Sequence, residues 1–350
     1  MSTMLQWPAS RPARPGDPLV DSFGRVHSDL RVSLTDRCSL RCTYCMPEQG
    51  NLWLERSTLL DAAEIEAIAR VAALDGVDTF RLTGGEPLLR RDLAEIVRRL
   101  TALTVGGRPV EVSMTTNGIG LAGRIDELAA AGLSRVNISL DTVRADRFAE
   151  LTKRDRLADV LDGIRAAAAS GLRPLKLNTV AMRGVNDDEL HDLVDLAVEH
   201  GAELRFIEQM PLDAGHTWDR STMLTRDEIL ETLSARWRLT EVDGRGDSPA
   251  ERFHLDGGPH TVGVIAAVTA PFCGACNRLR LTADGQVRNC LFARDELDLR
   301  RVLRSELSGT ERDAALDSVL RASVLGKQAG HGIDDPEFLQ PGRGMNAIGG

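Results

Sequence analysis

The sequence has no excess of positive charge and no long apolar run. Its 52 acidic and 43 basic residues give a formal net charge of −9, so the field of the whole protein repels nucleic acid and anionic membranes. No uncharged apolar stretch reaches the length of a membrane span, and the amino terminus lacks the apolar core of a signal peptide. We therefore expect a cytoplasmic protein without nucleic-acid or membrane partners. An anionic substrate would need a local cluster of arginine and lysine.

Cysteine is also scarce, and its distribution is informative. The six cysteines form two groups of three, Cys38, Cys42 and Cys45 near the start and Cys273, Cys276 and Cys290 near the end. Disulfides would have to pair two odd groups in a reducing compartment, which disfavours them. Metal ligation by all six residues is the simpler interpretation.

The first group has the spacing C-x-x-x-C-x-x-C in a loop after an apolar segment, residues 30–34. Three thiolates can hold three irons of a cubane cluster and leave the fourth iron open to an exogenous ligand, whereas an electron-transfer cluster normally has four cysteines. Short cysteine clusters also bind zinc, so spacing alone leaves both interpretations open. The only tyrosine of the chain, Tyr44, precedes the third cysteine.

The order of predicted strands and helices along the chain indicates a parallel α/β fold. Residues 1–28 are rich in proline and arginine and predict a poorly ordered leader. From residue 29 onward strands alternate with helices, which indicates βαβ units. The predicted strands are residues 30–34, 79–82, 110–114, 135–140, 175–180 and 203–207, and the predicted helices are residues 62–74, 92–100, 124–131, 157–169 and 187–199. Six strands fit an incomplete barrel or a doubly wound sheet, and periodicity does not separate the two.

Polar loops follow successive strands of this pattern. They comprise Gly84-Gly85-Glu86-Pro87, Thr115-Thr116-Asn117-Gly118 and Ser139-Leu140-Asp141, with Lys176 and Asn178 in the fifth strand and Glu208 and Met210 after the sixth. Each taken alone is typical of a turn, and Asp141 fits a helix cap. Parallel strands end at one edge of a sheet, where ligands bind, so together these loops predict a site.

The second cysteine group lies in a segment of different character that begins near residue 211. A helix near 225–236 precedes strands near 252–255 and 262–268, a cysteine-bearing hairpin, and helices near 297–306 and 310–322 that we expect to cover the open side of the sheet. A zinc site here would need a fourth ligand, such as His254 or His260. Arg278 and Arg280 share one face of a strand, which fits either a solvated edge or contact with a ligand.

These motifs resemble a known family. The first cysteine group with Tyr44, followed in order by the three polar loops, resembles the core of radical S-adenosylmethionine enzymes. The longer strings at residues 81–90 and 204–208 resemble the GTP 3′,8-cyclases, which begin molybdenum cofactor biosynthesis, and the likeness runs from about residue 23 to residue 350.

The resemblance implies an incomplete parallel TIM-like (β/α)6 barrel at residues 29–210 and a C-terminal iron–sulfur domain at 211–350. It implies two [4Fe–4S] clusters and S-adenosylmethionine, whose 5′-deoxyadenosyl radical takes the C3′ hydrogen of GTP. The product would be (8S)-3′,8-cyclo-7,8-dihydroguanosine 5′-triphosphate. Expected partners are GTP, a flavodoxin- or ferredoxin-like reductant and the next enzyme, cyclic pyranopterin monophosphate synthase. The sequence does not determine the oligomeric state, and a homodimer is one possible state.

The resemblance also implies site residues. The cluster ligands would be Cys38, Cys42 and Cys45, and Cys273, Cys276 and Cys290. S-adenosylmethionine contacts would be Tyr44, Gly85, Ser139 and Met210. GTP contacts would be Arg31, Arg81, Thr115, Lys176, Arg278, Leu279 and Arg280. Catalytic roles would fall on Arg278, Arg280, Gly349 and Gly350, with the glycine tail inside the cavity.

Three other interpretations remain. A peptide-modifying radical enzyme would typically carry more cysteines in its C-terminal part. A non-catalytic electron carrier or sensor would have no use for the Gly-Gly-Glu-Pro loop, and a zinc-stabilised nucleic-acid module is opposed by the net charge.

Overall fold

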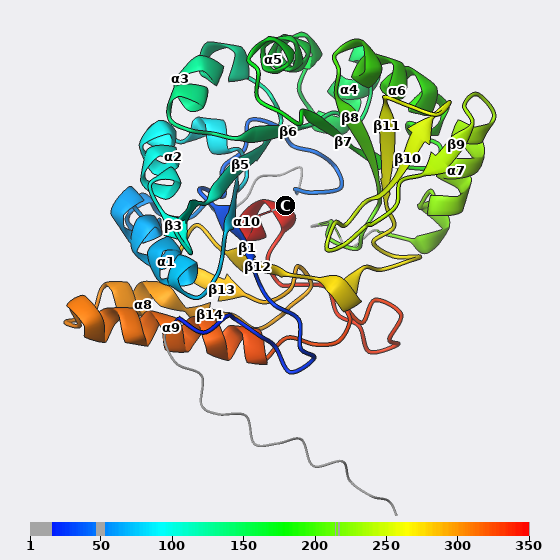
Figure 1. Ribbon diagram of the computed structural model, residues 1–350. Coiled ribbons are helices and arrows are strands. Elements are labelled where there is room, and N and C mark those ends of the chain that lie inside the picture. The colour runs from blue at the N-terminus through cyan, green and yellow to red at the C-terminus, as the bar shows by residue number, and fades with distance from the viewer. Residues whose placement is uncertain (1–15, 47–52, 214, 216–217, 350) are drawn as a thin grey trace, which may run out of the picture.

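The computed structural model describes residues 16–46, 53–213, 215 and 218–349. Its centre is a partial barrel of parallel strands with helices on the outside (Figure 1). The six predicted strands are present as β1 (Asp29–Ser33), β2 (Thr79–Thr83), β5 (Glu111–Thr116), β6 (Arg135–Ser139), β7 (Lys176–Ala181) and β8 (Glu203–Glu208). The incomplete barrel is therefore confirmed. Within the described residues no helix has the length and apolar character needed to cross a bilayer.

The outer helices lie close to their predicted positions. They are α1 (Ala62–Leu74), α2 (Leu93–Thr101), α3 (Ile125–Ala130), α5 (Leu157–Ala169) and α6 (Leu190–Glu199). Strand alternation sends side chains such as Leu30 and Phe80 outward into the core under these helices, where both are buried. The sequence prediction missed α4 (Ala145–Thr152), a helix of 8 residues.

The C-terminal segment shares the sheet of the barrel. β11 (Thr261–Ile265) pairs in parallel with β8 at one edge, and β12 (Arg278–Leu281) pairs in parallel with β1 at the other. Strands β9 (Leu239–Glu241) and β10 (Glu251–Leu255) continue the first edge, while β13 (Gln286–Arg288) and β14 (Leu297–Asp298) continue the second. A separate hairpin is formed by β3 (Thr104–Val105) and β4 (Arg108–Pro109). The second cysteine group is thus placed beside the barrel by its own strands.

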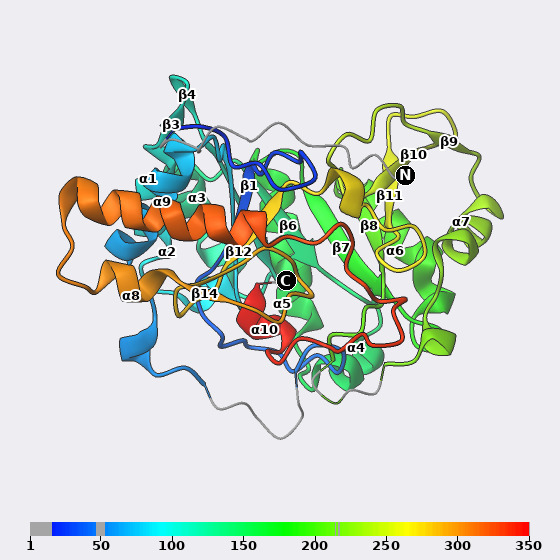
Figure 2. The ribbon, with the colours of Figure 1, turned by 90° about the horizontal axis from the view of Figure 1, so that it is seen from below.

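The remaining helices differ in part from prediction. They are α7 (Arg226–Ser234), α8 (Leu299–Leu303), α9 (Gly309–Leu325) and α10 (Met345–Ile348). Residues 297–306 were predicted as one helix, but they begin as strand β14 before α8. Helix α9 packs against α1 and β13 and so extends the outer helical layer (Figure 2). Helix α10 lies in the middle of the ring of strands (Figure 1).

The segment predicted to be poorly ordered, residues 1–28, includes residues that the structure shows as ordered. Residues 1–15 lie outside the described residues, but residues 16–28 pack on the protein, with Leu19 and His27 fully buried. Val20 and Val26 form a bridge, and the backbone N–H of Ser28 donates to the carbonyl of Asn277 (3.1 Å). Proline content suggested a leader, whereas burial of one leucine and long-range hydrogen bonds order this segment.

Candidate active site

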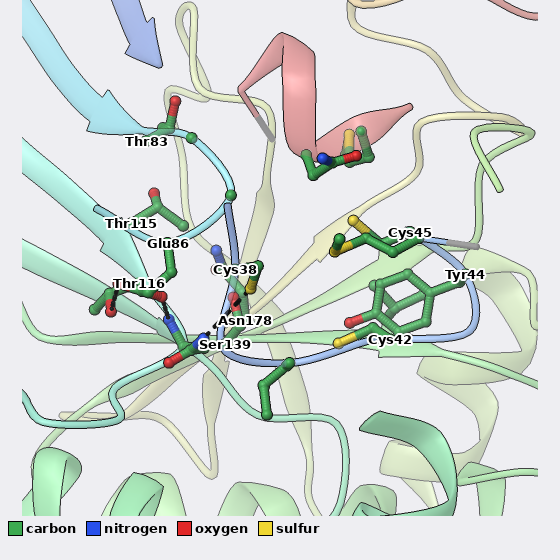
Figure 3. A pocket seen from close by; sticks show the side chains of 18 of the residues that line it. Cys38, Cys42, Tyr44, Cys45, Thr83, Glu86, Thr115, Thr116, Ser139 and Asn178 are labelled. Carbon is green, nitrogen blue, oxygen red and sulfur yellow. Dashed lines mark hydrogen bonds between the residues drawn. The ribbon is translucent and has the colours of Figure 1, made fainter. Parts of the chain in front are cut away.

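The first cysteine group lies in the loop after β1. The Arg41 guanidinium donates to the carbonyl oxygens of Cys38 and Leu40 at 2.8 and 2.7 Å, which fixes the loop from within. The backbone N–H of Arg41 also donates to the carbonyl of Thr152 at the end of α4 (2.8 Å). Cys38, Cys42 and Cys45 all line one cavity of about 190 Å³ (Figure 3).

Gly84 and Gly85 are required by close backbone packing. The N–H of Gly85 donates to the carbonyl of Thr35 (2.6 Å), and that of Glu86 donates to the carbonyl of Arg37 (2.7 Å). A Cβ at Gly85 would lie 2.2 Å from the Arg37 carbonyl oxygen, and Gly84 has φ of +141°. The glycines therefore seat the cysteine loop against the loop after β2, in addition to lining the cavity.

Glu86 joins its own loop after β2 to the loop after β5. Its buried carboxylate accepts a hydrogen bond from Thr116 Oγ1 (2.7 Å; Figure 3). It also accepts from Asn117 N (2.8 Å) and Leu88 N (2.9 Å). Burial raises the pKa of Glu86 to about 7, although these donors oppose the rise. The Asn117 amide in turn donates to Ser39 Oγ (2.9 Å) beside Cys38. The loop after β2, the loop after β5 and the cysteine loop thus form one connected network.

Asp141 has a different role from the helix cap that its position suggested. The Tyr44 hydroxyl donates to Asp141 Oδ2 (2.6 Å), and Val180 N donates to Oδ1 (2.9 Å). The N-cap of α4 is instead Arg144. Burial raises the pKa of Asp141 to about 6, with the Tyr44 hydrogen bond opposing. The pair fixes the tyrosine of the cysteine loop against β6 and β7.

Three of the four predicted S-adenosylmethionine contacts, Tyr44, Gly85 and Ser139, line the first cavity. Met210 is the exception, since it lines the cavity of the second cysteine group. Its contact with S-adenosylmethionine therefore stays a prediction.

The first cavity brings three thiols together. Burial raises the pKa of Cys42 well above its usual value and that of Cys45 to about 12, so ligation must displace their protons. Among the described residues, no three His, Cys, Asp or Glu side chains converge as one metal ion requires. A zinc ion needs its ligands at about 2.0–2.3 Å from one centre, whereas a cubane takes each cysteine on a separate iron.

The second cysteine group surrounds a smaller cavity of about 70 Å³. Cys273, Cys276 and Cys290 line it, together with Arg278, whose guanidinium lies 4.5 Å from the ring centre of Phe272. The histidines considered as zinc ligands, His254 and His260, do not line this cavity, and His331 does. Burial raises the pKa of Cys276, but nearby Lys327 and Arg278 outweigh burial and lower it.

Positive side chains gather on the inner face of the barrel. In the sheet register Arg31 lies between Arg81 and Arg280 on neighbouring strands. Lys176 is on the same face of β7, where burial and nearby Arg205 lower its pKa to about 7. Arg205 was quoted within the string at residues 204–208 but assigned no role. Its place between Leu204 and Phe206, which are both buried, was the available signal.

Several buried polar atoms on this inner face lack a hydrogen-bond partner among the described residues. They are Arg31 Nε, Arg81 Nε, Ser113 Oγ, Asn137 Oδ1 and Asn178 Oδ1. Leaving such atoms unpaired costs about 1–3 kcal/mol each. The inner face is therefore built to receive a polar ligand.

Arg278 and Arg280 are inside the molecule. They are 9% and 5% exposed, because β12 is an interior strand, so the solvated-edge interpretation is wrong. Leu279 between them packs its side chain into the outer hydrophobic core. Only the backbone of Leu279 is therefore left for its predicted contact with GTP.

Thr115, another predicted GTP contact, lines the first cavity.

The C-terminal tail enters the barrel. Asn346 of α10 donates to the carbonyl of Asp36 (2.9 Å), and Met345 and Asn346 line the first cavity. The Arg280 guanidinium donates to the carbonyl of Gly349, and a Cβ at Gly349 would lie 2.6 Å from Thr83 Oγ1. Gly350 lies outside the described residues.

Comparison with known proteins agrees with this arrangement. Residues 32–197 match the Radical SAM superfamily, and residues 202–333 match the Molybdenum Cofactor Synthesis C family. The chain is 55% identical over 350 residues to the GTP 3′,8-cyclase of Streptomyces coelicolor, which covers 99% of this chain and 100% of that protein. It is 50% identical over 345 residues to the GTP 3′,8-cyclase of Mycolicibacterium smegmatis, covering 97% and 94% of the two chains.

Among solved structures, SuiB of Streptococcus suis bound to S-adenosylmethionine superposes with a TM-score of 0.60 at 13% identity, covering 86% of this chain and 69% of SuiB. This likeness concerns the fold. The sequence relatives extend over nearly the whole chain at half identity or more, and they share one name. The chain therefore belongs to the GTP 3′,8-cyclase family of radical S-adenosylmethionine enzymes.

Proposed function

We propose that this protein cyclises GTP to (8S)-3′,8-cyclo-7,8-dihydroguanosine 5′-triphosphate, the first step of molybdenum cofactor biosynthesis. The observation that carries the proposal is the inner face of the barrel. There, cations lie beside buried polar atoms without a partner among the described residues, and each of two cavities is lined by three cysteines. A substrate with a triphosphate at one end and a polar base and sugar at the other fits such a surface.

The residues at the first cavity suit a cluster and S-adenosylmethionine. Cys38, Cys42 and Cys45 would hold a [4Fe–4S] cluster, which when bound supplies the electron that cleaves S-adenosylmethionine to the 5′-deoxyadenosyl radical. The protein contributes placement and exclusion of water. Tyr44, fixed by its hydrogen bond to Asp141, would hold one wall of the cavity still.

On the inner face, the cations would bind and orient GTP. Arg31, Arg81 and Lys176 would contact the triphosphate, and their burial makes each charge-assisted hydrogen bond stronger than at a surface. Cys273, Cys276 and Cys290 would hold the second [4Fe–4S] cluster, against which the guanine would be placed. Fixing GTP at both ends brings C3′ to the radical and limits side reactions.

Arg280 and the tail would complete the cavity. The hydrogen bond from Arg280 to the Gly349 carbonyl holds the thin glycine backbone against Thr83. We propose that this contact positions the terminal residues beside the substrate. The role of Gly350 is part of the same proposal.

Other partners are proposed on chemical grounds. A one-electron reductant of flavodoxin or ferredoxin type is needed because no described group of the chain supplies electrons. The product would pass to cyclic pyranopterin monophosphate synthase. A cytoplasmic location is proposed because all six cysteines act as reduced ligands. A homodimer is one oligomeric state compatible with these roles.

The test is anaerobic reconstitution with iron and sulfide, followed by incubation with S-adenosylmethionine, reductant and each nucleoside triphosphate in turn. We expect about eight irons per chain for two cubane clusters, and 5′-deoxyadenosine together with a cyclised product from GTP alone. Cys42→Ala should abolish S-adenosylmethionine cleavage and keep the second cluster. Cys276→Ala should keep the first cluster and lose productive GTP binding.

The control for both variants is the melting temperature, which separates a missing cluster from an unfolded chain. Zinc instead of iron in anaerobically purified protein would contradict the proposal. So would 5′-deoxyadenosine formation that does not depend on GTP.

A further inference from the structure

Lysine is rare in this sequence, and two of its three lysines are buried at the proposed site. Of 43 basic residues only Lys153, Lys176 and Lys327 are lysines. Lys153 is exposed, whereas Lys327 is 4% exposed. Burying an ammonium group is costly unless it is paired. What Lys327 contacts therefore indicates why it is there.

The ammonium of Lys327 contacts the second cysteine group directly. It follows α9 and donates to Cys276 Sγ at 3.4 Å and to the carbonyl oxygen of Arg278 at 2.7 Å. The first contact places a positive charge on a cluster thiolate. The second holds the start of β12, which carries the two arginines of the inner face.

A second cation, Arg25, holds the same region from the other side. Its guanidinium donates to the carbonyl oxygens of Cys273 (2.7 Å), Gln328 (2.7 Å) and Ala329 (3.1 Å). The carboxylate of Asp21, which is fully buried, fixes Arg25 at 2.6 Å. Arg25 thus links the loop of the first cysteine of this group to the residues that follow Lys327.

We propose that Lys327 and Arg25 form a cationic brace for the second cysteine group, in which Arg25 holds the cysteine loop and Lys327 offsets the negative charge of the bound cluster. This inference rests on the proposed function. Hydrogen bonds to cluster sulfurs and nearby charge are among the factors that set the reduction potential of an iron–sulfur cluster. Lys327 is therefore a positioning residue whose charge should raise that potential, because the reduced cluster carries one more negative charge.

The experiment uses the full chain with Cys38, Cys42 and Cys45 replaced by alanine, so that only the second cluster is present. In this background we compare Lys327→Met and Lys327→Arg, with Lys153→Met as the matched control at an exposed lysine. The readouts are iron content, melting temperature and the midpoint potential from an anaerobic redox titration followed by electron paramagnetic resonance. We expect a more negative potential for Lys327→Met, a value near the parent for Lys327→Arg and no change for Lys153→Met.

Two results support the proposal and two overturn it. A negative shift confined to Lys327→Met supports it. Loss of iron in Lys327→Met with an unchanged melting temperature, while Lys327→Arg keeps its iron, supports it as well. A potential equal to the parent in an iron-loaded Lys327→Met overturns it. Identical behaviour of the methionine and arginine variants also overturns it, because a charge role must distinguish them.

The role of Arg25 is tested with a variant that keeps its charge and removes its guanidinium group. Arg25→Lys keeps the charge but cannot reach three carbonyls at once, because it lacks the planar fork. We expect iron release to a chelator to be severalfold faster in Arg25→Lys than in the parent, and release rates equal to the parent would remove Arg25 from the brace. Absence of iron at this site in the parent itself would instead contradict the proposed function.

Discussion

Replacement of Lys176 by arginine should remove a pH dependence of GTP binding. Burial, Arg205 and Arg135 lower the pKa of Lys176 to about 7, and Glu203 only partly opposes them. Below that pH the side chain is an ammonium that attracts phosphate, and above it the side chain is a neutral amine. Affinity for GTP should therefore be full below the pKa and fall as pH rises through it. The neighbouring arginines stay charged throughout.

The size of the effect follows from the titration. The protonated fraction falls from about nine tenths to about one tenth between one unit below and one unit above the pKa. If the ammonium form alone binds well, the Kd for GTP should rise about tenfold between roughly pH 6 and roughly pH 8. In Lys176→Arg this part of the dependence should vanish, because arginine stays protonated.

The assay is anaerobic calorimetric titration of reconstituted protein with GTP across this pH range. GTP titrates near the same pH, because phosphate groups have a second pKa of about 6, and the arginine variant measures that contribution separately. The quantity to compare is the slope of log Kd against pH in the two proteins, since the absolute affinity changes with side-chain size. Equal slopes would refute the reasoning.

Two further substitutions and one deletion test the packing of the site. Gly85→Ala should lose the first cluster, because its Cβ would lie 2.2 Å from the Arg37 carbonyl oxygen. The control Gly123→Ala has open space around the Cβ position and should keep the cluster. Equal iron contents in the two variants would show that the cysteine loop can shift to accommodate the methyl group. Removal of Gly349-Gly350 should leave the iron content and melting temperature nearly unchanged and severely reduce cyclisation, and cyclisation at the parent rate would make the tail a mere chain end. Arg280→Lys should cyclise GTP more slowly than the parent, because lysine lacks the guanidinium fork. Cyclisation at the parent rate in this variant would contradict the role of the Arg280 guanidinium in completing the cavity.

The order of motifs and the strand pattern were predictable from the sequence because both are local. Alternation along one strand placed Arg278 and Arg280 on the same face, whereas Arg31, Arg81 and Lys176 were assigned to the site by the family resemblance, and only the sheet register shows that they share a face. The spacing of Cys38, Cys42 and Cys45 indicated a metal-binding loop, and the family resemblance favoured a cluster over zinc. Elements with strong periodicity, such as α1 and α5, had correct bounds for the same reason.

The tertiary structure decided which distant segments meet. Arg25 reaches the loop of Cys273 from 248 positions away, and nothing in the proline-rich start of the chain announced that contact. Lys327 and Met210 likewise acquire their neighbours only because β12 joins the sheet beside β1. The side chain determines the chemistry of each residue, but its burial and its partners depend on how strands far apart in sequence pair. A local sequence pattern does not determine that pairing.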